Sequence, residues 1–412
     1  MNVIHAHSQH PPSEIRVLLL ENVHDSAVEL FAAERFQVER VTSALSEAEL
    51  HKRLADVHVL GIRSKTQVSQ SVLVEARQLL TVGCFCIGTN QVDLVTATSR
   101  GLPVFNAPFS NTRSVAELIL AEVVMLSRHL GDRSREVHSG TWRKTADNAH
   151  EIRGKTLGII GYGHIGSQLG VLAEACGMRV IFYDRVTKLP IGNNRSYPTL
   201  PEMLAEADFV SLHVPATRET DGMIGPEEIK HMKRGACLLN ASRGSVVQIP
   251  ALAAALKSKH LRGAAIDVFP QEPESNSNGF VSELQGLPNV ILTPHIGGST
   301  TEAQESIGRE VATGLVKFVT AGATTGSVNF PELEMAPAPN THRVLNVHRN
   351  VPGVLRDVNR IVSERNANIH SQLLKTHENI GYLIMDLDED VSREVCRDIS
   401  GLETNIRTRI LY

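Results

Sequence analysis

Short apolar runs alternate with segments of helical period along most of this chain. In a first block, about residues 14–110, the apolar runs at 16–21, 57–63, 79–86 and 103–106 predict four strands separated by helices. This alternation is typical of a small α/β unit. A long helix is expected next, over residues 114–130, with one apolar face and with Asn111 or Thr112 as its cap.

A second block, residues 111–298, contains six further runs, at 157–160, 180–184, 209–214, 237–241, 264–268 and 290–293. The residues of these runs are almost continuously apolar. Strands have this composition when helices cover both faces of a parallel sheet. The block therefore predicts a doubly wound parallel sheet of the Rossmann type.

The helix after this block predicts how the two blocks are connected. Ser299-Thr-Thr-Glu302 has the form of a capping box and should open a helix through about residue 320. We expect that helix to return to the first block, so that residues 14–110 and 299–335 form one discontinuous domain into which 111–298 are inserted. Residues 323–341 contain prolines and lack an apolar period, which predicts a linker that separates this part from the C-terminal residues.

The C-terminal module, residues 342–412, has the pattern strand, helix, strand, strand, helix, strand. Its first helix, over residues 354–365, carries apolar residues on one face. A βαββαβ module of this size predicts a ferredoxin-like fold.

Composition narrows the classes of function. The chain has 412 residues and a net charge of -4, which argues against a nucleic-acid partner. No apolar run reaches the roughly 18–20 residues of a membrane span. The polar, His-rich residues 1–12 predict a flexible tail rather than a secretion signal or a metal site. The five cysteines lack both an even disulfide framework and metal-ligand spacing, so we expect a reducing cytoplasm and no metal.

The strongest motif follows the first strand of the second block. Gly161-Tyr-Gly163-His164-Ile165-Gly166 comes directly after the run 157–160, and the next run ends at Asp184. Glycines at this spacing allow a tight turn, the approach of a pyrophosphate to backbone amides, and close packing of the helix. An acid at the end of the second strand accepts hydrogen bonds from a ribose and repels the 2′-phosphate of NADP. We therefore predict that the block binds NAD.

Three further polar residues follow other strands of this block, namely Arg243, Glu272 and His295. The carboxyl ends of parallel strands meet at one edge of a sheet, where ligands bind. Arginine can bind a carboxylate through two hydrogen bonds, and we favour this role for Arg243 over the alternative of a structural ion pair. A glutamate bonded to one imidazole nitrogen fixes the tautomer and leaves the other nitrogen for a substrate hydroxyl. Together the three residues predict oxidation or reduction of a 2-hydroxy acid.

These motifs resemble those of the D-isomer-specific 2-hydroxyacid dehydrogenases. The likeness runs from about residue 15 to 412 and is carried by residues 61–66, 83–93, 161–166, 240–244, 267–273 and 295–298. The C-terminal module, with its loop 348–353, is similar to an ACT domain, a sensor of small ligands. The resemblance implies a Rossmann-type NAD domain inserted in a flavodoxin-like α/β substrate domain, followed by a ferredoxin-like ACT domain.

The resemblance also implies roles for individual residues. His295 would exchange a proton with the substrate, Glu272 would be its partner, and Arg243 would anchor the substrate carboxylate. The substrate phosphate would be held by Arg63, Ser64, Lys65 and Lys144, the last lent by a neighbouring subunit. Relatives often have arginine where Lys65 stands, and lysine lacks the bidentate geometry. The NAD site would be lined by Gly161, Gly163, His164, Ile165, Gly166, Asp184, Ala241, Ser242, Arg243, Asp267, His295, Ile296, Gly297 and Gly298.

The implied reaction is oxidation of 3-phospho-D-glycerate to 3-phosphohydroxypyruvate by NAD⁺, the first step of L-serine synthesis. The implied assembly is a cytoplasmic homotetramer inhibited by L-serine bound at His348, Asn350 and Asn368. The same catalytic residues could instead reduce glyoxylate, hydroxypyruvate or 2-oxoglutarate, because specificity rests on a few cations. A non-enzymatic NAD-sensing scaffold is the alternative of a different class, and the complete Arg–Glu–His set argues against it.

Overall fold

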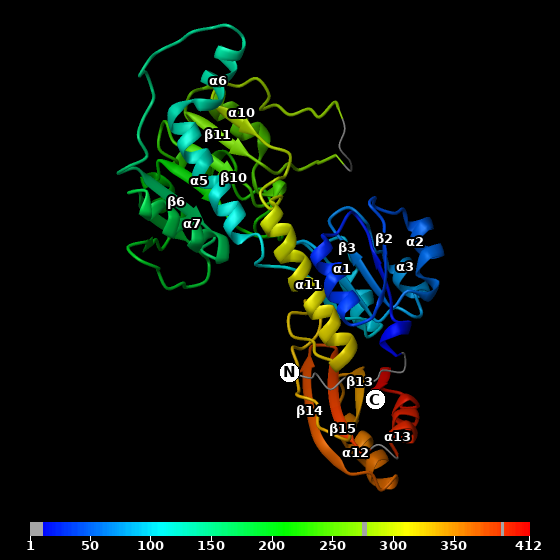
Figure 1. Ribbon diagram of the computed structural model, residues 1–412. Coiled ribbons are helices and arrows are strands. Elements are labelled where there is room, and N and C mark those ends of the chain that lie inside the picture. Colours follow the sequence, from blue (N-terminus) through cyan, green and yellow to red (C-terminus); the bar gives the residue numbers. More distant parts are fainter. Residues whose placement is uncertain (1–10, 274–277, 389–390) are drawn as a thin grey trace. The chain divides into compact units, whose positions relative to one another are not determined.

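The computed structural model describes residues 11–273, 278–388 and 391–412, and it divides into two compact units. The first unit contains the chain up to Ser110 together with Gln304–Tyr412, and the second unit is Asn111–Ala303. Figure 1 colours the first unit blue, yellow and red and the second unit cyan to green.

The first unit contains a parallel sheet in the order β2-β1-β3-β4-β5, the flavodoxin-like order. The four predicted strands of this block are confirmed. The fifth strand, β2, was not predicted, because its residues are mostly exposed and polar and give no apolar signal. The strands are β1 (Arg16–Leu19), β2 (Gln37–Arg40), β3 (Val59–Ile62), β4 (Thr81–Cys84) and β5 (Val104–Phe105), and the helices are α1 (Asp25–Ala33), α2 (Glu47–Arg53), α3 (Gln70–Glu75) and α4 (Leu94–Ser99).

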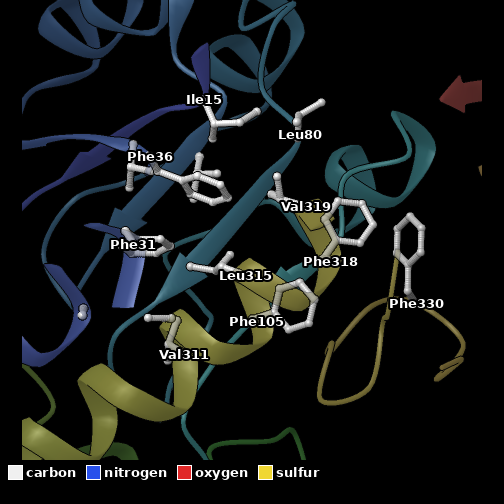
Figure 2. Close-up of a cluster of buried hydrophobic side chains, with 14 of the residues drawn as sticks. Ile15, Phe31, Phe36, Leu80, Phe105, Val311, Leu315, Phe318, Val319 and Phe330 are labelled. Atoms are coloured by element: carbon white, nitrogen blue, oxygen red, sulfur yellow. The ribbon is translucent and has the colours of Figure 1, made fainter. Parts of the chain in front are cut away.

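Helix α11 (Thr301–Ala321) packs its apolar face against this sheet, as predicted. Figure 2 shows Val311, Leu315 and Phe318 of α11 in a cluster that also contains Phe31, Phe36 and Phe105. The contact requires Gly83 in β4, because a Cβ there would lie 2.6 Å from Leu315 Cδ1. The predicted cap was wrong by one residue: the hydroxyl of Thr300, not of Ser299, accepts the N–H of Ala303.

The C-terminal module has the predicted order of elements and an antiparallel sheet, β14-β15-β13-β16. One face of the sheet packs on α12 and α13 through residues such as Val344 and Leu383. The other face, which includes Leu345 and Tyr382, belongs to the same apolar cluster as α11. The elements are β13 (His342–Arg349), α12 (Val354–Glu364), β14 (Ile369–His377), β15 (Ile380–Leu387), α13 (Ser392–Ser400) and β16 (Asn405–Leu411).

The expectation that residues 323–341 separate this module from the rest was wrong. Phe330 is 5% exposed and its ring meets that of Tyr382 edge-on at 5.8 Å. The Tyr382 hydroxyl in turn donates to the carbonyl of Gly322 at 2.6 Å. The segment lacks an apolar period because it follows an irregular path, but its few apolar side chains are buried in the shared core.

The second unit is built on a seven-stranded parallel sheet in the order β12-β11-β10-β9-β6-β7-β8. The six predicted strands are confirmed, and the seventh, β8 (Arg195–Ser196), is a two-residue exposed edge strand without an apolar signal. The long helix α5 (Thr112–Arg128) is followed by its C-cap residue His129, whose φ is 52°. The other strands are β6 (Thr156–Ile160), β7 (Arg179–Tyr183), β9 (Phe209–Leu212), β10 (Cys237–Asn240), β11 (Gly263–Ile266) and β12 (Val290–Leu292), and the helices are α5 (Thr112–Arg128), α6 (Leu130–His138), α7 (His164–Ala175), α8 (Leu200–Glu206), α9 (Pro226–His231) and α10 (Ile249–Lys257).

Among the described residues, no helix combines the length and the hydropathy that crossing a membrane would need. The same residues contain no group of three or more His, Cys, Asp or Glu side chains that could hold a metal ion. All five cysteines are free thiols.

Candidate active site

The glycine motif forms the turn between β6 and α7. Gly161 has a φ of 90°, and a Cβ there would lie 2.3 Å from the carbonyl oxygen of His213. Gly166 is equally constrained, since its Cβ would lie 2.3 Å from the carbonyl oxygen of Gly161. A Cβ on Gly163, at the N-cap of α7, would meet only open space. Packing within the protein therefore requires glycine at 161 and 166. Glycine at 163 instead leaves room for a phosphate group beside the helix N-terminus.

Asp184 follows β7 and is held beside this turn. Its Oδ2 accepts the N–H of Tyr162 at 2.8 Å, and its Oδ1 accepts the N–H of Val186 at 2.9 Å. Tyr162 is fixed in turn by stacking on Phe182, with the ring centroids 3.7 Å apart. Each carboxylate oxygen retains a lone pair that a ribose hydroxyl could use. The turn, the open glycine and the acid fit the adenosine diphosphate part of NAD.

Arg243 is positioned by two loops at the carboxyl ends of β10 and β11. The Asn240 side chain accepts from the N–H of Ser242 and donates to the carbonyl of Arg243 at 3.0 Å, which shapes the first loop. Gly244 lies so close to the second loop that a Cβ would be 2.0 Å from the carbonyl carbon of Phe269. Only glycine permits this approach, which places Arg243 next to the loop that carries Glu272.

His295 and Glu272 form the hydrogen bond that the sequence predicted. Nδ1 of His295 lies 2.8 Å from Oε2 of Glu272, and the other carboxylate oxygen accepts the N–H of Phe269 at 3.0 Å. The histidine side chain is 51% exposed. Nδ1 is thus occupied by the carboxylate, and Nε2 is the nitrogen left for proton transfer with a ligand.

The same contact shifts both pKa values. The hydrogen bond to Glu272 raises the pKa of His295, against partial burial and the positive charge of Arg243. Burial by itself raises the pKa of Glu272, but the hydrogen bonds from His295 and Phe269 outweigh it, and the net pKa is lowered. The pair therefore consists of a carboxylate and an imidazole that titrates above its ordinary range, which suits a general base near neutral pH.

Asp267 has a structural task that its place in the sequence did not indicate. The side chain is 1% exposed, and its Oδ1 and Oδ2 accept the N–H groups of Ile296 and Gly297, both at 2.8 Å. The Asp267 carbonyl also accepts the N–H of His295 at 2.7 Å. These three bonds hold His295 in the left-handed region, at a φ of 55°, which non-glycine residues rarely adopt.

Sequence reasoning missed a second buried acid in this unit, Glu122 of α5. It is 2% exposed, and its Oε1 has no hydrogen-bond partner. Burial, together with the charge of Asp267, raises the pKa of Glu122 to about 8. The sequence did contain an indication of this burial, because Glu122 lies between Ile119 and Leu126 on the apolar face of the predicted helix.

In the first unit, Glu21 organises the loop that carries the predicted phosphate ligands. Its carboxylate accepts the backbone N–H groups of Arg63, Lys65 and Thr66 at 2.8–3.2 Å. Arg63 lines a polar cavity of about 240 Å³, together with Asn22, Val23, His24, Asp25, Arg40 and Gln304. Lys65 and Ser64 are not among the lining residues. Arg40 is already paired with Asp25, so Arg63 is the better placed of the two arginines for an anionic ligand.

Lys144 and the three predicted effector residues lie on the surface or inside the C-terminal module. Lys144 is exposed, in a segment without regular structure that also presents Trp142. Asn350 and Asn368 are exposed. His348 is 4% exposed, and its Nδ1 lies 2.8 Å from Oδ1 of Asn346, so its ring faces the inside of the module rather than the loop surface.

Comparisons with known proteins agree with this geometry. A family model described as the NAD binding domain of D-isomer specific 2-hydroxyacid dehydrogenases matches residues 120–297, and an AHAS small subunit-like ACT domain matches residues 345–407. The D-lactate dehydrogenase of Aquifex aeolicus, solved with NAD and lactic acid, superposes with a TM-score of 0.67 at 28% identity over 77% of this chain and 100% of that chain.

Relatives that match almost the whole chain identify the family more specifically. D-3-phosphoglycerate dehydrogenase of Dictyostelium discoideum is 57% identical over 98% of both chains. D-3-phosphoglycerate dehydrogenase of Escherichia coli K12 is 50% identical over 97% of this chain and 98% of its own. The chain belongs to the D-3-phosphoglycerate dehydrogenase family, and it is an NAD-dependent oxidoreductase.

Proposed function

We propose that this enzyme oxidises 3-phospho-D-glycerate to 3-phosphohydroxypyruvate, the first step of L-serine synthesis. The observation that carries the proposal is the Glu272–His295 hydrogen bond of 2.8 Å with Arg243 close enough to affect the histidine pKa. Bound NAD⁺ would supply the hydride acceptor. The relatives at 50–57% identity carry the name of this activity, which supports the choice of substrate.

The protein groups divide the remaining work. Nε2 of His295 accepts the proton of the substrate hydroxyl, and Glu272 stabilises the imidazolium that results. Arg243 holds the substrate carboxylate and fixes the hydroxyl-bearing carbon relative to His295. Arg63 in the first unit, with Ser64, Lys65 and Lys144 as further candidates, binds the phosphate.

A turnover assay with a panel of acids tests this function. Purified enzyme and NAD⁺ should oxidise 3-phospho-D-glycerate with a far higher kcat/KM than D-lactate, D-glycerate or D-2-hydroxyglutarate. His295→Asn should lose about 10²–10⁴-fold in kcat and retain NAD binding. A higher kcat/KM for an unphosphorylated acid would reassign the enzyme to a reductase of 2-oxoglutarate, hydroxypyruvate or glyoxylate.

We further propose that L-serine inhibits a cytoplasmic homotetramer through the C-terminal module. Asn350 precedes α12 and Asn368 follows it, and the 11 residues of that helix span about 16 Å. One serine can therefore touch both side chains only where two copies of the chain meet. Burial lowers the pKa of His348, so its contribution would be as a neutral ring within the module.

Calorimetric titration and inhibition assays test this regulation separately from catalysis. Asn350→Ala and Asn368→Ala should each abolish serine inhibition and leave kcat near the wild-type value. Sedimentation should give four chains per particle. Wild-type enzyme that binds no serine would remove the regulatory site without affecting the assignment of the reaction.

A further inference from the structure

A small cavity lies where the sheet of the C-terminal module packs on the rest of the first unit. Its volume is about 10 Å³, which admits a single small occupant. Apolar side chains form most of the wall, and two arginines supply its charge. The lining includes Leu80, Phe318, Tyr382, Arg407 and Arg409.

The two arginines come from alternate positions of β16, so they project from the same face of the sheet. Nη1 of Arg407 donates to the carbonyl of Leu79 at 2.7 Å, and Nη2 of Arg409 donates to the carbonyl of Val319 at 3.1 Å. Arg409 is 8% exposed and lies over the Phe318 ring at 5.3 Å. Its Nη1 is buried and has no hydrogen-bond partner.

No acid balances this pair within the described chain. Burial lowers the pKa of Arg409 to about 10, and burial together with the charges of Arg409 and Arg100 lowers the pKa of Arg407 to about 10. No carboxylate acts on either group. Both guanidinium groups remain charged at neutral pH, and an unpaired charge that is removed from water is costly.

Arg343 of the same module shows the alternative arrangement. It is 3% exposed, and Asp386 accepts from its Nε at 2.7 Å and from its Nη2 at 2.9 Å. Its other N–H groups donate to the carbonyls of Ala321, Met335 and Ala336. Arg343 therefore has its counter-charge and three carbonyl acceptors within the protein, whereas Arg409 has no carboxylate partner among the described residues and its Nη1 has no acceptor.

We propose that the cavity binds a monatomic anion of the chloride class, held by Arg409 and Arg407. The two arginines bring only N–H donors to the lining, and the Tyr382 hydroxyl, whose proton goes to Gly322, brings a single oxygen that can accept. A water molecule would find few acceptors for its own two protons among apolar neighbours, whereas a halide only accepts. The anion would offset the arginine charge and stabilise the contact between the module and α11.

Halide-dependent melting of the full-length enzyme tests the site. At constant ionic strength, replacing sodium gluconate by sodium chloride or bromide should raise the melting temperature in a saturable way. Arg409→Met should lose this response. The control is Arg365→Met, which removes an exposed arginine of the same module that pairs with Asp398, and it should keep the response.

Crystals of the wild-type enzyme soaked in bromide provide a readout that does not depend on a variant. We expect an anomalous peak within hydrogen-bond distance of Arg409 Nη1. Ordered water without a peak, or a peak without any halide-specific rise in melting temperature, overturns the proposal. So does an Arg409→Met variant that keeps the full response. Should Arg409→Met fail to fold, the wild-type peak and melting curve decide together.

Discussion

The backbone N–H of His295 donates to the carbonyl of Asp267 at 2.7 Å, and this bond anchors the histidine in a left-handed conformation with a φ of 55°. The two amides that follow His295 are fixed by the Asp267 carboxylate. One buried residue therefore sets the backbone of the group to which we assign proton transfer, while Glu272 sets its ring.

Exchange of Glu272 for glutamine should move the acid limb of the pH profile. Oxidation needs a neutral His295, so activity is lost as pH falls through the pKa of that histidine. Glu272 raises this pKa, and Glu272→Gln should shift the limb of kcat/KM to lower pH and reduce kcat. Glu219→Gln removes an exposed carboxylate paired with Arg185 and should leave the profile in place. An unshifted limb in Glu272→Gln would contradict the pairing.

Asp267→Asn should act through the position of His295. A misplaced catalytic group costs roughly 10–100-fold in kcat. The acid limb should also move to lower pH, because the Asp267 charge contributes to the raised pKa of His295. Asp267→Ala should in addition destabilise the unit by about 1–3 kcal/mol, since the Gly297 amide is left buried without an acceptor. Unchanged kcat and pH profile in Asp267→Asn would refute the positioning role.

Asp184→Asn should narrow the preference for NAD over NADP. The variant removes the charge that repels a 2′-phosphate and retains one oxygen to accept a backbone amide of Tyr162 or Val186. The measurement is kcat/KM for both cofactors, with melting temperature as the control for folding. Asp184→Ala should show the same change in preference with a larger loss of stability. A wild-type enzyme that uses both cofactors equally would contradict the assignment.

Arg63→Ala should raise KM for 3-phospho-D-glycerate roughly 10–100-fold and have little effect on D-glycerate. A charge-assisted hydrogen bond of about 1.5–3 kcal/mol is lost only with the phosphorylated substrate. Arg40→Ala is the matched control, because Arg40 lines the same cavity but is paired with Asp25. Equal effects of Arg63→Ala on the two substrates would place the phosphate elsewhere.

Glu122 should make stability fall with rising pH. Its pKa is about 8 in the folded protein against an ordinary value of 4.5, so between these pH values the folded state binds a proton that the unfolded state has released. Stability is lost across this window, by at most about 1.4 kcal/mol per pH unit, and levels off above it. Glu122→Gln has no titrating group at this position, so its free energy of unfolding should not fall in this window. In denaturant unfolding, the free energy of unfolding of Glu122→Gln minus that of the wild type should therefore increase from pH 5 to pH 8. A constant difference would mean that Glu122 is ionised throughout.

Period and composition were sufficient to predict the fold class and most of the elements. The six predicted strands of the second unit and the four of the first are almost continuous apolar runs, which is the pattern expected of strands covered on both faces. The two missed strands, β2 and β8, lie at sheet edges, where exposed polar residues form a ladder without any apolar period. The predicted grouping of Arg243, Glu272 and His295 followed from parallel topology, which brings strand ends to one edge.

Only the tertiary structure decided how these groups are held and how the C-terminal module is attached. The left-handed backbone of His295 depends on Asp267, and the pKa of Glu122 depends on burial that a helical pattern indicates but does not measure. Arg407 donates to the carbonyl of Leu79, a residue 328 positions earlier. A local pattern records only neighbours along the chain, so contacts between distant residues, and the charges they bury, become visible only when the chain is folded.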